Sequence, residues 1–123
     1  MNVWIDSKGI DVKNIIFVLL AIYSSVLYAA GWTSTASVEH VEVIRAQGFE
    51  IKGAFGNPSN CEFGDSVFVS IEHPQYDQLL SVALAAFMGN KKLRIYSHQC
   101  VNYGWHGGTH NELISHGSMY LVN

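Results

Sequence analysis

The 123-residue chain is poor in cysteine, proline and charged side chains. It has two cysteines, two prolines and 14% charged residues. Its 7 lysines and arginines do not outnumber its 10 aspartates and glutamates, so it lacks the basic excess that proteins use to bind nucleic acids or anionic membranes. We therefore expect no nucleic-acid partner.

The chain also lacks the short motifs of the commonest enzyme classes. It contains no GxSxG, no HExxH and no glycine-rich phosphate-binding motif. Asp65, Ser66 and His98 are residue types of a nucleophilic triad, but three such common residues are often found by chance in a chain of this length. We predict that the protein is not an enzyme, with no catalytic residues and no cofactor.

The main apolar run of the chain lies near its N-terminus. It extends from Ile15 to about Tyr28 after two lysines, which is too short for a comfortable membrane span but typical of a secretory signal. The small residues at 29–31 suit a signal peptidase. We predict a signal peptide over residues 1–31 and a mature domain over residues 32–123.

A cut after Ala36 and an uncleaved N-terminal anchor are the alternatives for this segment. Each places the rest of the chain in an oxidising compartment, so we predict a secreted or periplasmic protein with no membrane span after signal cleavage. There, Cys61 and Cys100 most simply form one structural disulfide, because neither belongs to a CxxC motif. A pair of reactive free thiols is the alternative.

Alternating apolar and polar residues predict three strands in the first half of the mature chain. The strands cover residues 38–46, 49–55 and 65–71, and the first two form a hairpin through Gln47 and Gly48. The segment GNPSN that precedes the third strand is typical of a turn.

A change to helical spacing follows at Pro74, and it predicts a helix that ends at Gly89. Its apolar stripe consists of Tyr76, Leu79, Leu80, Ala83, Leu84 and Phe87. A fourth strand is predicted over residues 91–100 and a short one over 118–123, whereas the glycine-rich stretch 104–108 disfavours regular structure. The fold is therefore mainly β with one helix, in the order β-β-β-α-β-β of a small five-stranded OB-fold-like barrel.

Four stretches of the chain resemble a family of bacterial toxins, the receptor-binding B subunits of subtilase cytotoxin and typhoid toxin. They are WTS at Trp32, QGFEIKG at 47–53, SNCEFGDSVF at 59–68 and, above all, YDQLLSVALAAFMGNKKLRIY at 76–96. Members of that family are exported OB-folds that assemble as pentamers and bind cell-surface glycans. A second interpretation is a small secreted bacterial protein of this fold with no assigned role.

The resemblance implies a non-catalytic binding protein with a cell-surface glycan as ligand. It also implies a homo-oligomer, a pentamer, and an A-type toxin subunit as partner. Two positions depart from the family pattern. Glu50 stands where the family has the cysteine that pairs with the one matching Cys61, and Ser97 stands where its sialoglycan pocket has a tyrosine.

Aromatic and polar residues near the fourth strand are the candidate ligand site, because flat rings cover the apolar face of a sugar and short polar groups bind its hydroxyls. The predicted ligand-binding residues are Tyr96, Ser97, His98, Tyr103, Trp105 and His106. The alternative role for Tyr103 and Trp105 is to fill the end of the barrel.

Four histidines suggest a competing function, a periplasmic metal-binding protein. They are His98, His106, His110 and His116. Gly107 and Gly108 disfavour the helix that would bring His106 and His110 together, so the main prediction assigns no metal ligand. A third interpretation is a structural or partner-binding component whose helix carries Ala85 and Ala86 on its contact face.

Overall fold

The computed structural model describes residues 29–103 and 106–123, which form nine strands and one helix. The prediction of a mainly β fold with one helix is confirmed. Almost all of the predicted signal peptide, residues 1–28, lies outside the described residues. The predicted boundary between residues 31 and 32 falls within the first described strand.

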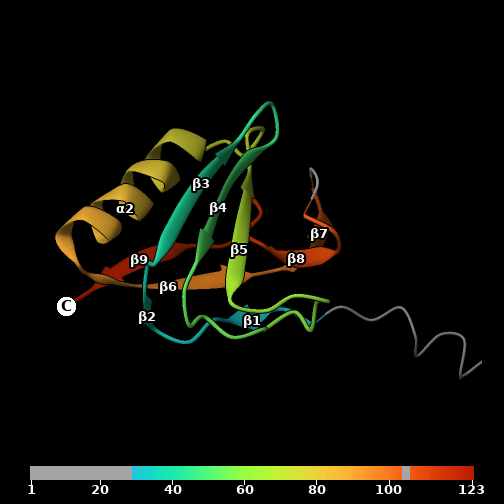
Figure 1. The fold of residues 1–123 in the computed structure, drawn as a ribbon, viewed down its shortest axis with the longest axis horizontal. Coiled ribbons are helices and arrows are strands. Elements are labelled where there is room, and N and C mark those ends of the chain that lie inside the picture. Colours follow the sequence, from blue (N-terminus) through green and yellow to red (C-terminus); the bar gives the residue numbers. More distant parts are fainter. Residues whose placement is uncertain (1–28, 104–105) are drawn as a thin grey trace, which may run out of the picture.

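The larger sheet has five strands in the order β3-β4-β5-β8-β7 (Figure 1). Their pairing is antiparallel, except that β5 and β8 are parallel. The bounds are β3 His40–Ile44, β4 Gly48–Lys52, β5 Ser66–Ser70, β7 Gln99–Asn102 and β8 Thr109–Glu112. The first three strands confirm the predicted strands, with shorter ends. The predicted hairpin is also present, because β3 and β4 pair over their whole length, with Ile44 opposite Gly48.

The smaller sheet is built around β6 and is antiparallel throughout. Two short strands, β1 and β2, pair with successive parts of β6, and β9 pairs with its other edge. The bounds are β1 Gly31–Trp32, β2 Ala36–Ser37, β6 Lys92–Ser97 and β9 Met119–Val122. The predicted closing strand is therefore present as β9.

The chain passes from one sheet to the other four times, between β2 and β3, β5 and β6, β6 and β7, and β8 and β9. Two of these passages are short, because residues 38 and 39 separate β2 from β3 and His98 alone separates β6 from β7. The prediction of one strand over residues 91–100 is therefore wrong. This segment contains β6 and the start of β7, which belong to different sheets. In the described part of the chain the two sheets do not close into a barrel, so the barrel part of the prediction is not confirmed.

The helix α2, Tyr76–Gly89, packs beside β3, β6 and β9 (Figure 1). It ends because Asn90 adopts the left-handed conformation, with φ of 54°, and its backbone N–H binds the carbonyl of Ala86. Leu79, Ala83 and Ala86 are its buried residues. Within the described residues, no helix is long and apolar enough to cross a membrane.

The predicted apolar stripe of the helix needs a correction. Leu84 and Phe87, two members of that stripe, are 43% and 45% exposed, whereas Ala86 is 1% exposed. A small side chain lets the helix approach the sheets closely, and the larger apolar residues point outward. Of the two alanines predicted to form a contact face, Ala86 is buried against the sheets and Ala85 is exposed.

The hydrophobic core lies between α2 and the two sheets. It takes alternate residues of the central strands, among them Phe49, Ile51, Val67 and Val69, all fully buried. Because side chains alternate across a strand, the residues between them project from the opposite face of the larger sheet. We call this opposite side the outer face; there, Glu42 on β3 is paired with Glu50 on β4, and Glu50 with Phe68 on β5.

The predicted disulfide between Cys61 and Cys100 is confirmed. The two Cα atoms are 5.5 Å apart, and neither cysteine is free. The bond joins the loop before β5 to β7, at the far end of the larger sheet from β3.

Candidate functional sites

An exposed aromatic group covers part of the smaller sheet. Trp32 on β1 contacts Tyr96 on β6 and Tyr120 on β9, with ring centroids 5.3 and 5.5 Å apart in edge-to-face arrangements. Trp32 and Tyr120 are 40% and 41% exposed. The three rings meet because the pairing of β1 and β9 with β6 brings residues far apart in sequence together.

Two nitrogen-bearing side chains flank these rings. The guanidinium carbon of Arg94 lies 5.3 Å from the Trp32 ring centroid, and an Arg94 amine lies 3.5 Å from the Tyr120 hydroxyl. On the other side, the His98 ring contacts Tyr96 edge-to-face at 4.8 Å. We call Trp32, Arg94, Tyr96, His98 and Tyr120 the aromatic surface.

The surroundings of His98 favour the neutral form of its imidazole. Burial and the nearby imidazoles of His116 and His73 lower the pKa of His98, although a backbone hydrogen bond involving His116 opposes them. The backbone N–H of Ile114 donates to His98 Nδ1 at 3.3 Å, a contact that requires an unprotonated nitrogen there.

Ser97, a predicted ligand residue between Tyr96 and His98, points into the protein. It is fully buried, and its hydroxyl contacts Ser59 Oγ at 2.6 Å and donates to Asn111 Oδ1 at 3.2 Å. Strand alternation places its neighbours outside and Ser97 inside. We therefore assign Ser97 to the interior and not to a ligand surface.

Two further predicted ligand residues, Tyr103 and His106, follow β7 and contact side chains of the larger sheet. Tyr103 is buried and stacks on Phe68, with ring centroids 4.1 Å apart, while His106 lies 5.2 Å from the Tyr103 ring. Tyr103 and His106 therefore lie on the outer face of the larger sheet; Tyr103 is buried there, and not at the end of a closed barrel. Trp105, the remaining predicted ligand residue, lies outside the described residues.

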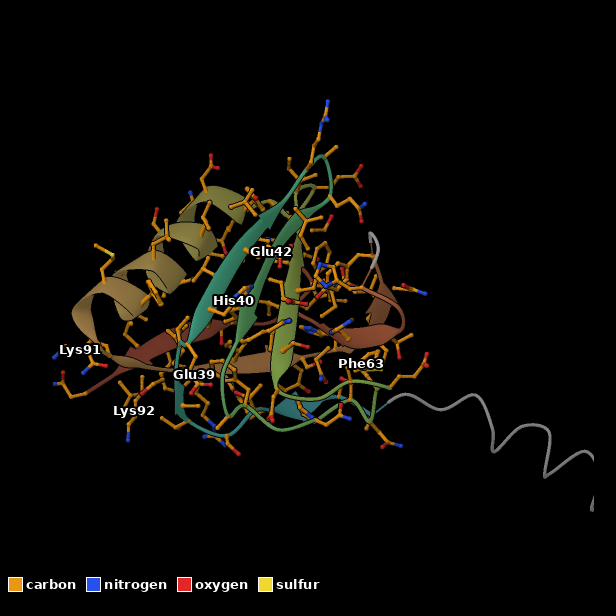
Figure 2. All side chains as sticks on the ribbon, viewed as in Figure 1. Glu39, His40, Glu42, Phe63, Lys91 and Lys92 are labelled. Carbon is orange, nitrogen blue, oxygen red and sulfur yellow. A yellow bond between two sulfur atoms is a disulfide. The ribbon has the colours of Figure 1, made fainter. Side chains whose placement is uncertain are left out.

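A cluster of histidine and glutamate side chains occupies this outer face. His40 and Glu42 are two residues apart on β3 and share a face, with Nε2 and Oε1 3.3 Å apart (Figure 2). His106 approaches the other Glu42 oxygen, also at 3.3 Å. Burial raises the pKa of Glu42, but hydrogen bonds from His40 and His106 and their positive charge outweigh it, so the net pKa is below its ordinary value.

Glu50, opposite Glu42 on the neighbouring strand, is fully buried. Its oxygens lie 3.4 Å from Lys52 Nζ and 3.6 Å from His110 Nδ1, yet neither accepts a hydrogen bond from a described residue. One oxygen each of Glu42 and Glu50 and one nitrogen of His40 all lie within 4.8 Å of one another. We call His40, Glu42, Glu50 and His106 the His–Glu cluster.

His110 supports this cluster from β8. Its Nδ1 lies 2.7 Å from the Ser66 hydroxyl, and its ring stacks on Phe63 (labelled in Figure 2) with centroids 5.1 Å apart. A cavity of about 320 Å³ is lined in part by Lys52, Ser66 and His110, the neighbours of Glu50. The cluster itself is open to solvent at His40, which is exposed.

The four histidines of the competing metal-binding prediction do not form one group. His106 and His110 lie on the outer face of the larger sheet, with ring centroids 6.1 Å apart, while His98 lies near His116. The sequence interpretation missed His40, Glu42 and Glu50 as possible ligands. The signal was present, since a predicted hairpin with alternating residues brings polar side chains of adjacent strands together.

Comparison of the chain with known proteins found no matching family model, no similar curated protein and no similar solved structure.

Proposed function

We propose that the protein is an exported, non-catalytic binding protein whose aromatic surface recognises glycans. The observation that carries the proposal is the exposed group of Trp32, Tyr96 and Tyr120 beside Arg94. Aromatic rings bind the apolar face of a pyranose, and a guanidinium donates several hydrogen bonds to hydroxyl or carboxylate oxygens. The disulfide is compatible with export.

The surface is suited to binding because its rings are held by strands of a sheet and not by a flexible loop. Trp32 and Tyr96 occupy directly paired positions of β1 and β6, and Arg94 is paired with Tyr120 across β6 and β9. Backbone pairing on both edges of β6 fixes the distances between the side chains, so little conformational entropy is lost when a ligand binds.

A glycan array that includes neutral and acidic sugars tests this proposal directly. We expect a restricted set of glycans to bind and Trp32→Ala to abolish that binding, because Trp32 is the ring that touches both tyrosines. Phe87→Ala is the matched control, since Phe87 is equally exposed but lies on the helix. Absence of glycan binding, or binding that survives Trp32→Ala, contradicts the proposal.

Trp105→Ala separates the aromatic surface from the loop that follows β7. Loss of binding in Trp105→Ala alone assigns the ligand to the loop, as the sequence predicts, and contradicts the assignment to the smaller sheet. Retained binding in Trp105→Ala, with loss in Trp32→Ala, supports the aromatic surface.

The toxin-like part of the proposal concerns assembly. The resemblance to toxin B subunits implies an OB-type topology, a pentamer and an A-type partner. Native mass spectrometry of the exported protein tests this: five copies support the toxin-like interpretation, and a monomer leaves a glycan-binding protein without that assembly.

A further inference from the structure

We infer that the His–Glu cluster binds a divalent transition metal ion, with zinc as the best match. His40, Glu42 and Glu50 are the primary ligands, and His106 is the fourth. This site is independent of the proposed glycan-binding function, because it lies on the larger sheet and shares no residue with the aromatic surface.

The spacing of the donor atoms fits a zinc site. Two ligands that bind zinc at about 2.0–2.1 Å in a tetrahedron lie about 3.3–3.4 Å apart. His40 Nε2 lies 3.3 Å from Glu42 Oε1, and one Glu50 oxygen is within 4.8 Å of the His40 and Glu42 donors. His106 Nε2 lies 3.3 Å from the other Glu42 oxygen, so it joins these donors at one ion only when its ring or the Glu42 carboxylate turns.

Glu50 is the observation that distinguishes this cluster from a solvated group of charges. A fully buried carboxylate normally accepts hydrogen bonds, since an unsatisfied one loses its hydration energy without compensation. Both Glu50 oxygens accept none from the described residues, and one of them lies within 4.8 Å of the His40 and Glu42 donors. A bound cation supplies the missing interaction.

The charge balance of the cluster also favours a cation. Glu42 and Glu50 contribute two negative charges to the outer face, against one positive charge from Lys52 when the imidazoles are neutral. Lys52 is an incomplete partner, because it approaches Glu50 at 3.4 Å without a hydrogen bond. Its side chain is 44% exposed, so it is free to turn toward water when an ion binds.

The ligand types determine which ion fits. Imidazole nitrogen combined with carboxylate oxygen suits zinc and its neighbours in the transition series, whereas magnesium and calcium prefer oxygen ligands alone. Thiolate ligands, which select copper(I), are not available because both cysteines form the disulfide.

Residues around the proposed ligands orient them and give access. His110 Nδ1 stands 3.6 Å from Glu50 Oε2 and 2.7 Å from Ser66 Oγ, which limits the positions of the Glu50 carboxylate. Because His40 is exposed, a hydrated ion can approach the cluster from solvent at that residue.

Calorimetric titration of the EDTA-treated, disulfide-bonded protein with zinc tests the inference. We expect one zinc ion per chain with a Kd below about 10 μM. Glu50→Gln and His40→Ala are each expected to weaken binding at least about 30-fold, since loss of a direct ligand exceeds the effect of a supporting residue. Excess magnesium or calcium is expected to leave zinc bound.

His116→Ala is the matched control, because it removes an exposed imidazole outside the cluster and must leave zinc affinity unchanged. Thermal unfolding of each metal-free variant shows whether it is folded, and His40→Ala keeps the test decisive if Glu50→Gln does not fold, since His40 is exposed. Absence of zinc binding by the unaltered protein up to about 100 μM overturns the inference. So does full affinity in either cluster variant, or loss of affinity in His116→Ala.

Discussion

Two groups of buried polar side chains lie in this small protein, and they differ in how completely they are hydrogen-bonded. The first surrounds Asn111 on β8. Asn111 Oδ1 accepts from the Ser59 backbone N–H at 2.9 Å and from Ser97 Oγ at 3.2 Å, and its amide donates to Asn57 Oδ1 at 3.0 Å. Within the described residues, every buried side-chain donor and acceptor of this amide network has a hydrogen-bond partner.

The second group is the His–Glu cluster with its neighbours on the outer face. There, both Glu50 oxygens, His110 Nε2 and the Tyr103 hydroxyl are buried without a hydrogen-bond partner among the described residues. The contrast indicates different roles. Satisfied networks fix a structure, whereas unsatisfied buried groups require another explanation, and the proposed metal site is one that the charges support.

The largest loss of stability is expected when the disulfide beside the Asn111 network is removed. Asn57 binds the backbone of Cys61 at both its N–H and its carbonyl, so the disulfide and the amide network support one another. Replacing Cys61 and Cys100 by serine is expected to lower the free energy of unfolding by about 4 kcal/mol, because the unfolded chain gains the freedom of the opened loop. Urea unfolding measures this, and a loss below about 1 kcal/mol contradicts it.

Asn111→Ala tests the network itself. We expect a loss of about 3 kcal/mol of unfolding free energy, because the Ser59 N–H and the Ser97 hydroxyl lose an acceptor in a buried site. Asn102→Ala, at an exposed position of β7, is the control and is expected to be nearly neutral. Equal losses in the two variants argue against a special role for the network.

Replacing a buried polar residue of the His–Glu cluster is expected to raise the free energy of unfolding, whereas Asn111→Ala lowers it. In metal-free protein, Glu50→Gln removes a buried charge that no hydrogen bond stabilises, so we expect the unfolding free energy to rise by about 1 kcal/mol. Chemical unfolding in EDTA measures the difference. A loss of that size instead means that Lys52 and His110 already stabilise the carboxylate.

The last effect concerns pH and His98, which belongs to neither group. Its pKa in the folded state is below its ordinary value, so the unfolded chain takes up the proton first as the pH falls. Stability is therefore complete above about pH 6.5 and declines below it, by at most about 1.4 kcal/mol per pH unit for one proton. His98→Asn, which retains an acceptor for the Ile114 N–H, is expected to flatten the decline between pH 6.5 and 5.

The central part of the fold was predictable from the sequence because its signals are local. Alternation over residues 38–55 and 65–71 predicts three strands, and the helical spacing after Pro74 predicts α2. The strand at Thr109–Glu112 was missed because THNE shows no apolar alternation and follows two glycines. Its parallel pairing with β5 depends on contacts between residues more than forty positions apart.

The sites were predictable only in part, because they too depend on pairing between residues far apart in the sequence. Tyr96 and His98 are visible as alternating residues of one strand, but the approach of Trp32 and Tyr120 requires the register of β1 and β9 against β6. The interior position of Ser97 also depends on which face meets the core. For Glu50, the sequence shows a charged residue between Phe49 and Ile51, and nothing local indicates that its side chain is fully buried.

The parallel pairing of β5 with β8 has a consequence for how the protein matures. β5 and β8 are separated by the helix and two further strands, so their pairing closes a loop of more than forty residues and is costly in chain entropy. His110 lies on β8 and reaches Glu50 only through this pairing. We therefore expect Glu50 to be hydrated in any partly folded chain in which β8 has not joined the sheet.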